Sequence, residues 1–97
     1  MNDSNVVELH DAHVQAYTRE LACNIMKLAM EVSSPDYSVF VEWTPHVDGL
    51  SVHIHNEGWK RDHRPEQSYT VYLDQDEAHK KLLNISRLIE KWNPATK

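Results

Sequence analysis

The stretch that decides the fold is residues 36–56, DYSVFVEWTPHVDGLSVHIHN. Apolar and polar side chains alternate on both sides of Asp48-Gly49, with the period of two that β-strands show when they bury one face. An Asp-Gly pair between two such runs is a strong hairpin signal. The stretch therefore predicts two antiparallel strands, over 36–44 and 50–56.

The register of this hairpin decides which side chains share a face of the sheet. Pairing Trp43 with Leu50 places Phe40 opposite His53, because side chains alternate between the two faces along each strand. A polar loop follows, and the alternation resumes in a third strand over 67–73. We expect this strand to lie beside the second one and to complete a three-stranded antiparallel meander.

A long amphipathic helix is predicted before the strands, over residues 5–33. Asn5 can cap its first turn and Glu8 can complete a capping box, while Pro35 prevents the helix from continuing. The apolar positions fall within an arc of roughly 80° at about 100° per residue. The expected buried stripe consists of Val7, Val14, Tyr17, Leu21, Ile25, Leu28 and Val32.

A second helix is predicted after the strands, over residues 75–93. Asp74 is its expected N-cap, Glu77 completes the capping box, and Pro94 stops it. Its expected buried stripe consists of Ala78, Leu82, Ile85, Ile89 and Trp92, with Leu88 at the margin. The chain is thus predicted to be one domain, 1–97, of the α+β class: a two-layer sandwich of order αβββα with both helices on one sheet face.

The composition is that of an ordinary folded domain. Of the 97 residues, 40% are hydrophobic and 26% are charged, which argues against disorder. No window reaches the ~20 apolar residues that a membrane span needs, and the first residues lack the basic and then apolar layout of a signal peptide. Cys23 is the only cysteine. A reducing compartment, the cytoplasm, is therefore expected.

The charge is distributed unevenly along the chain. Residues 1–58 carry nine acidic and two basic side chains, whereas residues 59–97 carry six acidic and eight basic ones. The net charge of −5 does not favour binding to nucleic acid. An acidic half beside a weakly basic half favours a protein partner with basic patches, or self-association, although charge that serves only solubility gives the same pattern.

The back of the first helix is unusually apolar for a solvated face. Arg19 interrupts a set of small or flexible side chains there, and small residues and methionine suit close or irregular contacts. Twenty-eight helical residues span about 42 Å and eight strand residues only about 27 Å, so the helix should extend beyond its sheet. We expect an antiparallel homodimer through this face; the alternative is a chance surface. The predicted interface residues are Ala12, Ala16, Cys23, Met26 and Met30.

The sheet face opposite the helices is the second candidate surface. Aromatic and histidine side chains gather on it, and the following loop adds an aromatic residue among cations. The predicted partner-binding residues are Phe40, Glu42, His53, His55, Trp59, Arg61 and Tyr72. Alternatively, His53 and His55 serve a metal or small-molecule site, since alternate strand residues point the same way; a third metal ligand is not evident. Trp59 can also simply fold back over the sheet edge.

No catalytic pattern stands out. The chain lacks a glycine-rich phosphate loop and a nucleophile elbow, and no cofactor is indicated. The order helix–strand–strand–strand–helix resembles that of double-stranded RNA-binding domains. Those domains open their last helix with a lysine run, whereas this chain has Asp74-Gln75-Asp76-Glu77, which lacks the phosphate clamp.

In size and charge the chain is similar to small phage-encoded inhibitors of host enzymes. We therefore expect a small non-enzymatic protein-binding module, of the kind of a phage-type inhibitor or an accessory protein that acts on a larger host protein. The alternative is a metal- or small-molecule-binding domain that uses His53 and His55.

Overall fold

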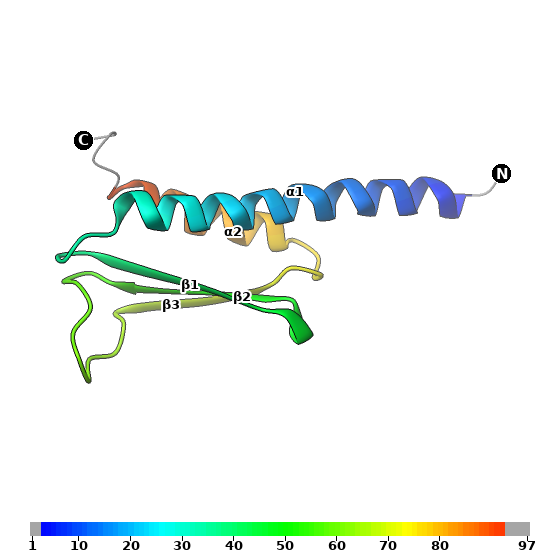
Figure 1. Cartoon of the computed structure of the whole chain (residues 1–97). Coiled ribbons are helices and arrows are strands. Elements are labelled where there is room, and N and C mark those ends of the chain that lie inside the picture. Colours follow the sequence, from blue (N-terminus) through cyan, green and yellow to red (C-terminus); the bar gives the residue numbers. More distant parts are fainter. Residues whose placement is uncertain (1–2, 93–97) are drawn as a thin grey trace.

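The computed structural model describes residues 3–92, with side chains from Ala12 onward. The elements are α1 (Asp3–Val32), β1 (Ser38–Thr44), the 3-10 turn η1 (Pro45–Val47), β2 (Gly49–His55), β3 (Gln67–Tyr72) and α2 (Ala78–Glu90). Both helices lie on the same face of the sheet, and the loop between β2 and β3 lies on the other side (Figure 1). The predicted two-layer α+β sandwich is confirmed.

The sheet has the strand order β1-β2-β3, and both pairs are antiparallel. Its register pairs Trp43 with Leu50 and Phe40 with His53, as the hairpin pattern predicts. Asp48 follows the 3-10 turn in the left-handed region, with a φ of 50°. Aspartate adopts this conformation more readily than most residues, which explains why the hairpin signal in the sequence lies here.

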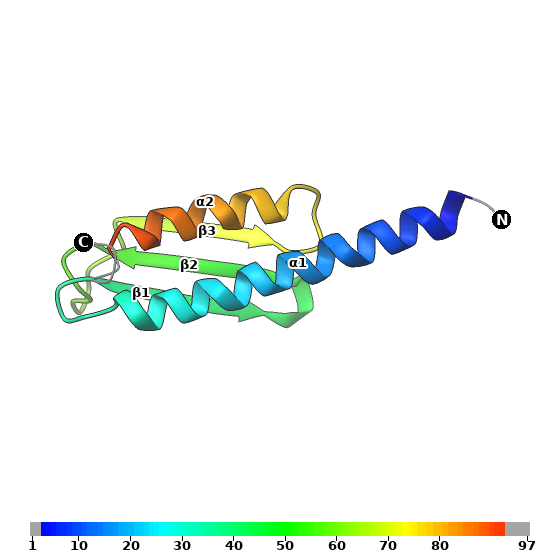
Figure 2. The same cartoon turned by 90° about the horizontal axis from the view of Figure 1, so that it is seen from above.

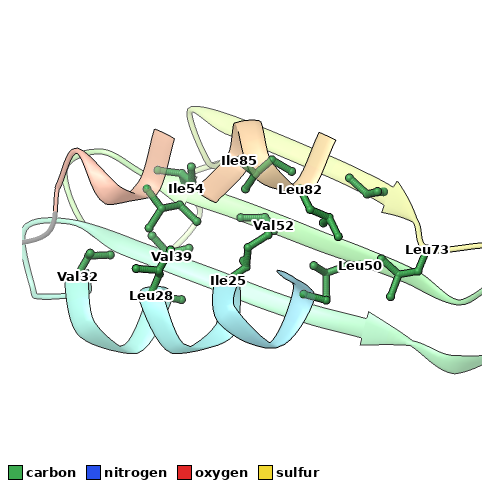
Figure 3. Close-up of a cluster of buried hydrophobic side chains, with 14 of the residues drawn as sticks. Ile25, Leu28, Val32, Val39, Leu50, Val52, Ile54, Leu73, Leu82 and Ile85 are labelled. Carbon is green, nitrogen blue, oxygen red and sulfur yellow. The ribbon is translucent and has the colours of Figure 1, made fainter. Parts of the chain in front are cut away.

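The hydrophobic core lies between the sheet and the two helices. Figure 3 shows Ile25 from α1, Val52 from β2 and Leu82 from α2 within this layer. The exposed fraction of each of these three side chains is 0%. Because burial of apolar surface is the main favourable contribution to folding, this layer supplies most of the stability of the domain.

The buried face of α1 is turned relative to the predicted stripe. Tyr17 exposes 43% of its surface, whereas Thr18, Ala22 and Ala29 are buried. The hydroxyl of Thr18 is satisfied because it donates to the carbonyl of Val14, 2.8 Å away. The prediction followed the large apolar residues and overlooked these small ones, which allow the helix to approach the sheet closely.

Both helices begin at positions that differ from the prediction. α1 begins at Asp3, so that Asn5 lies inside the helix and is not its N-cap. α2 begins at Ala78, because Glu77 is left-handed with a φ of 68°, a conformation that cannot continue into a preceding helical turn. Glu77 therefore occupies the N-cap position without a side-chain cap, and the predicted capping box that starts at Asp74 does not form.

The end of α2 differs from the prediction in one residue of the expected stripe. The buried residues of α2 are Ala78, Leu82, Ile85 and Ile89, as predicted. Trp92 lies beyond the helix, exposes 40% of its surface and stacks on Tyr37, with ring centroids 4.3 Å apart. Among the described residues the buried hydroxyl of Tyr37 has no hydrogen-bond partner, and burial raises the pKa of Tyr37 to about 12.

This tyrosine predicts a loss of stability in alkali. The unfolded chain releases the phenolic proton near pH 10.0, before the folded protein does, so stability is full below that pH and falls as the pH rises toward about 12. Tyr37→Phe removes this titration and the unsatisfied hydroxyl, so the variant should lose less stability over the range. Urea unfolding across it measures the difference, with Tyr72→Phe as the control; equal losses in wild type and Tyr37→Phe would contradict the prediction.

The N-terminal half of α1 projects beyond the end of the sheet. Figures 1 and 2 show this in two perpendicular views. Within the projecting part, Ala12, His13 and Ala16 are exposed, and Thr18 is the first buried residue among those with described side chains. The predicted extension of the helix past its own sheet is therefore present. In residues 3–92, no helix has the combination of length and apolar composition that crossing a bilayer requires.

Candidate functional site

Residues of the loop between β2 and β3, which lies on the side of the sheet away from the helices, form a cleft with residues of the open sheet face. The loop descends from the sheet end that holds the last residues of β2 (Figure 1). The cleft has a volume of about 570 Å³. Its lining residues are Phe40, Glu42, His53, His55, Trp59, His63, Arg64, Pro65 and Ser68.

Gly58 allows the loop to take this path. Its φ is +84°, and a Cβ at this position would overlap the carbonyl oxygen of Pro35, in the turn that follows α1. Its amide donates to the carbonyl of His55 at 3.1 Å. The next amide, that of Trp59, donates to the hydroxyl of Ser38 at 3.2 Å. These contacts hold the start of the loop against β1 and place the indole of Trp59 at the cleft.

The far end of the loop is held by a second contact. The backbone amide of Asn56 donates to the carboxylate of Glu66 at 3.0 Å, which joins the first and last residues of the loop. This hydrogen bond holds the pKa of Glu66 below its ordinary value. The loop is therefore closed at its base.

The floor of the cleft is aromatic and carries imidazole groups. Phe40 and His55 meet edge to face, with ring centroids 5.4 Å apart, and His55 is only 5% exposed. The Nδ1 atom of His53 lies 3.0 Å from the hydroxyl of Ser68 on β3, which orients the ring. Sequence analysis expected His55 on an uncovered face, but the loop covers this end of the sheet.

The rim of the cleft combines exposed aromatic surface with one charge of each sign. Trp59 exposes 58% of its surface and Phe40 exposes 46%. In the part of the chain whose side chains are described, neither Arg64 nor Glu42 has an ion-pair partner. An apolar group can therefore rest on the two rings while a carboxylate reaches Arg64 or a cation reaches Glu42.

The structure brings together five of the seven predicted partner-binding residues, namely Phe40, Glu42, His53, His55 and Trp59. Arg61 and Tyr72 do not line the cleft. Tyr72 instead lies opposite Gly49, where its ring would contact an added Cβ at 3.3 Å.

Sequence reasoning missed four lining residues: His63, Arg64, Pro65 and Ser68. The mixture of cations and an aromatic residue in 58–65 marked this loop as unusual. No local pattern indicates toward which face such a loop folds. Only alternation within β3 offered a signal, since Ser68 is predicted on the same face as His53.

A metal site is not assembled by the described side chains. From Ala12 to Trp92, no three histidine, cysteine, aspartate or glutamate side chains lie close enough together to hold a metal ion. His53 and His55 do share the cleft. The imidazole and aromatic side chains of the cleft can form hydrogen bonds with a bound group and stack on its rings.

The outer face of α1, defined by Ala12, Ala16, Cys23, Met26 and Met30, is exposed along its whole length. Met30 exposes 73% of its surface and Cys23 is a free thiol. Beside it runs an apolar groove of about 360 Å³ between α1 and β1, lined by Arg19, Ala22, Cys23, Met26, Val41, Trp43, Leu50 and Leu73.

Arg19, the charged residue that interrupts the predicted interface, is bound to the hairpin turn. Its guanidinium donates two hydrogen bonds to the carboxylate of Asp48, at 2.7 and 3.3 Å. The indole Nε1 of Trp43 donates to the same carboxylate at 2.9 Å. The Arg19 hydrogen bond, aided by that of Trp43, holds the pKa of Asp48 below its ordinary value.

We expect this cluster to make a contribution to the stability of the fold that is lost at acidic pH. Because the pKa of Asp48 is lowered on folding, its contribution is present above its ordinary value of 3.8 and is lost as the pH falls through the lower folded value. Asp48→Asn keeps the left-handed turn, so the variant should be less stable at neutral pH by about 1 kcal/mol or less, as for exposed pairs. Urea unfolding from neutral to strongly acidic pH tests this, with Asp36→Asn as control; a difference that persists below the folded pKa would contradict it.

Comparison of the chain with protein-family models, curated proteins and solved structures finds no match.

Proposed function

We propose that this chain is a small non-enzymatic protein-binding module whose partner-binding site is the cleft under the β2–β3 loop. One observation carries the proposal: Phe40 and Trp59 expose large aromatic surfaces at one concave place on the sheet face that faces away from both helices. Exposed aromatic residues that cluster in a concavity are typical anchors of protein interfaces.

The partner group that suits the cleft is a peptide segment with an apolar side chain next to a charged one. Phe40 and Trp59 offer the apolar contact, and Arg64 offers a guanidinium that can bind a carboxylate with two hydrogen bonds. Cations of the partner are attracted by Glu42 and by the acidic N-terminal half of the chain.

The proposed biological form is an inhibitor or accessory protein, of the phage type, that acts on a larger host protein in the cytoplasm. Its support is the small size and net charge of −5, together with a single free cysteine that suits a reducing compartment. The proposed module is dimeric through the outer face of α1, because that face is apolar and exposed.

The proposal is tested by affinity capture from host lysate with matched baits. A specific partner should be retained by the wild type and by Tyr17→Ala, which removes an exposed aromatic side chain far from the cleft. It should be lost with Phe40→Ala and with Trp59→Ala, by at least tenfold in affinity once the partner is purified, as expected for an interface anchor. Equal capture by all four baits would overturn the assignment of the cleft.

A second candidate function is small-molecule binding at the same cleft through His53 and His55. The imidazole groups of His53 and His55 line the same cleft, and this shared lining favours the candidate. Thermal denaturation against a library of small aromatic acids separates the two. Under this second function, a compound should raise the midpoint for the wild type and leave His53→Ala unchanged.

A further inference from the structure

The exposed face of α1 has a spacing that is symmetric about its centre. With Arg19 included, its residues form a line that we call the α1 seam: Ala12, Ala16, Arg19, Cys23, Met26 and Met30. Successive members are four, three, four, three and four positions apart. This is the alternation by which a straight stripe on one helix faces the same stripe on another helix.

Reversing the seam returns the same spacing, so two antiparallel copies can align position by position. This alignment of the whole seam requires that position 21 of one copy lie opposite position 21 of the other. In that register Ala12 faces Met30 of a second copy, and Ala16 faces Met26. Each long, flexible methionine thus meets a small alanine, and the pairing leaves neither a clash of two large side chains nor a gap between two small ones.

The central pair of this register joins Arg19 to Cys23 of the other copy. A free guanidinium would oppose burial there. In this structure both arms of Arg19 already point to Asp48, 2.7 and 3.3 Å away, and the side chain is half exposed. The charge at the centre of the seam is therefore compensated within each chain, and the rest of the seam is uncharged.

The projection of α1 supplies an independent reason for a second copy. Figures 1 and 2 show the N-terminal half of the helix beyond the sheet. A helix in water is stabilised chiefly by the packing of one face, and Ala12 and Ala16 are exposed in this chain. In the register centred on position 21, they would pack against the methionines in the C-terminal half of the other copy's α1.

From the spacing, the size pairing and the compensated arginine, we infer that the occupant of the α1 seam is a second copy of this chain, antiparallel and centred on position 21. This inference rests on the dimer proposed above and specifies its geometry. The partner-binding cleft lies on the opposite side of the sheet from the helices and is left open in such a dimer.

Pairwise cysteine cross-linking tests the register on the full chain. In a Cys23→Ser background, Ala16→Cys and Met26→Cys are made as separate proteins, mixed, and equilibrated in a glutathione buffer. The mixture should form a covalent dimer, while neither protein should do so alone. The control mixes Ala16→Cys with Met30→Cys, which is displaced by about 6 Å along the helix and should not cross-link.

Light scattering separates failure of the register from failure of the dimer. The wild type should have twice the chain mass of 11.3 kDa, and Met26→Glu should return it to the single mass, whereas Asn24→Glu, on the same helix but off the seam, should not. A dimer without the Ala16–Met26 cross-link would overturn the register alone. A wild type of single mass would overturn both the dimer and this inference, and would leave the binding cleft to its own test.

Discussion

Gly58→Ala is expected to lower the free energy of unfolding by roughly 2–5 kcal/mol and to abolish the proposed partner binding at the cleft. The left-handed conformation costs about 1–2 kcal/mol for alanine, and forcing a methyl group into an occupied space costs about 1–3 kcal/mol. Here the occupied space is the backbone carbonyl of Pro35, which cannot rotate away as a side chain could. The loop must therefore shift, and Trp59 shifts with it.

Gly49→Ala is the matched control for this prediction. Its added Cβ would meet the ring of Tyr72 at 3.3 Å, and its φ is not positive, so a small movement of one side chain accommodates it. Urea unfolding should place Gly49→Ala much closer to the wild type than Gly58→Ala. Intrinsic tryptophan fluorescence, to which Trp59 contributes with Trp43 and Trp92, should also change in Gly58→Ala under native conditions. Equal stability of the two variants would refute the role given to Gly58 in closing the loop.

Ile25→Ala should have the largest effect among single substitutions in α1, a loss of about 2–5 kcal/mol. Ile25 is 0% exposed and extends from α1 into the layer between the helices and the sheet that includes Val52 and Leu82 (Figure 3). Truncation removes buried apolar surface and leaves a cavity that the surrounding β-strands cannot close. For a domain of this size, such a loss is a large share of the total stability.

Lys27→Ala is the control for Ile25→Ala, because it shortens an exposed side chain of the same helix outside the seam. Its free energy of unfolding should differ from that of the wild type by less than about 0.5 kcal/mol. Urea denaturation followed by circular dichroism measures both variants. A loss below about 1 kcal/mol for Ile25→Ala would mean that α1 does not form part of the cooperative core.

The strand part of the fold could be predicted well from the sequence. Alternation about Asp48-Gly49 predicted both strands of the hairpin and the pairing of Trp43 with Leu50, and this register is observed. A shift of one residue would have turned every apolar side chain of one strand to the wrong face, and the Asp48-Gly49 turn signal selects among the registers that keep the faces.

The helices were predicted less completely. Their existence and order follow from the apolar period of 3.6. The rotation of α1 about its own axis depends on how closely the helix packs on the sheet. Ala22 and Ala29 are buried, whereas Tyr17, which was expected to be buried, is exposed. The start of α2 depends on the left-handed backbone of Glu77, which the capping pattern does not reveal. The rotation of α1 and the start of α2 both depend on how the two helices pack against the three strands.

By itself, the sequence determined which side chains share the open sheet face: Phe40, His53 and His55 follow from alternation alone. It also determined the apolar outer face of α1, since helical periodicity is local. Tertiary structure decided that Trp59 and Arg64 of the β2–β3 loop line a cleft with that face, because the loop is held by contacts to Pro35 and Ser38, far away in the sequence. A periodic pattern carries information about neighbours along an element, whereas the path of a loop depends on contacts between segments that only folding brings together.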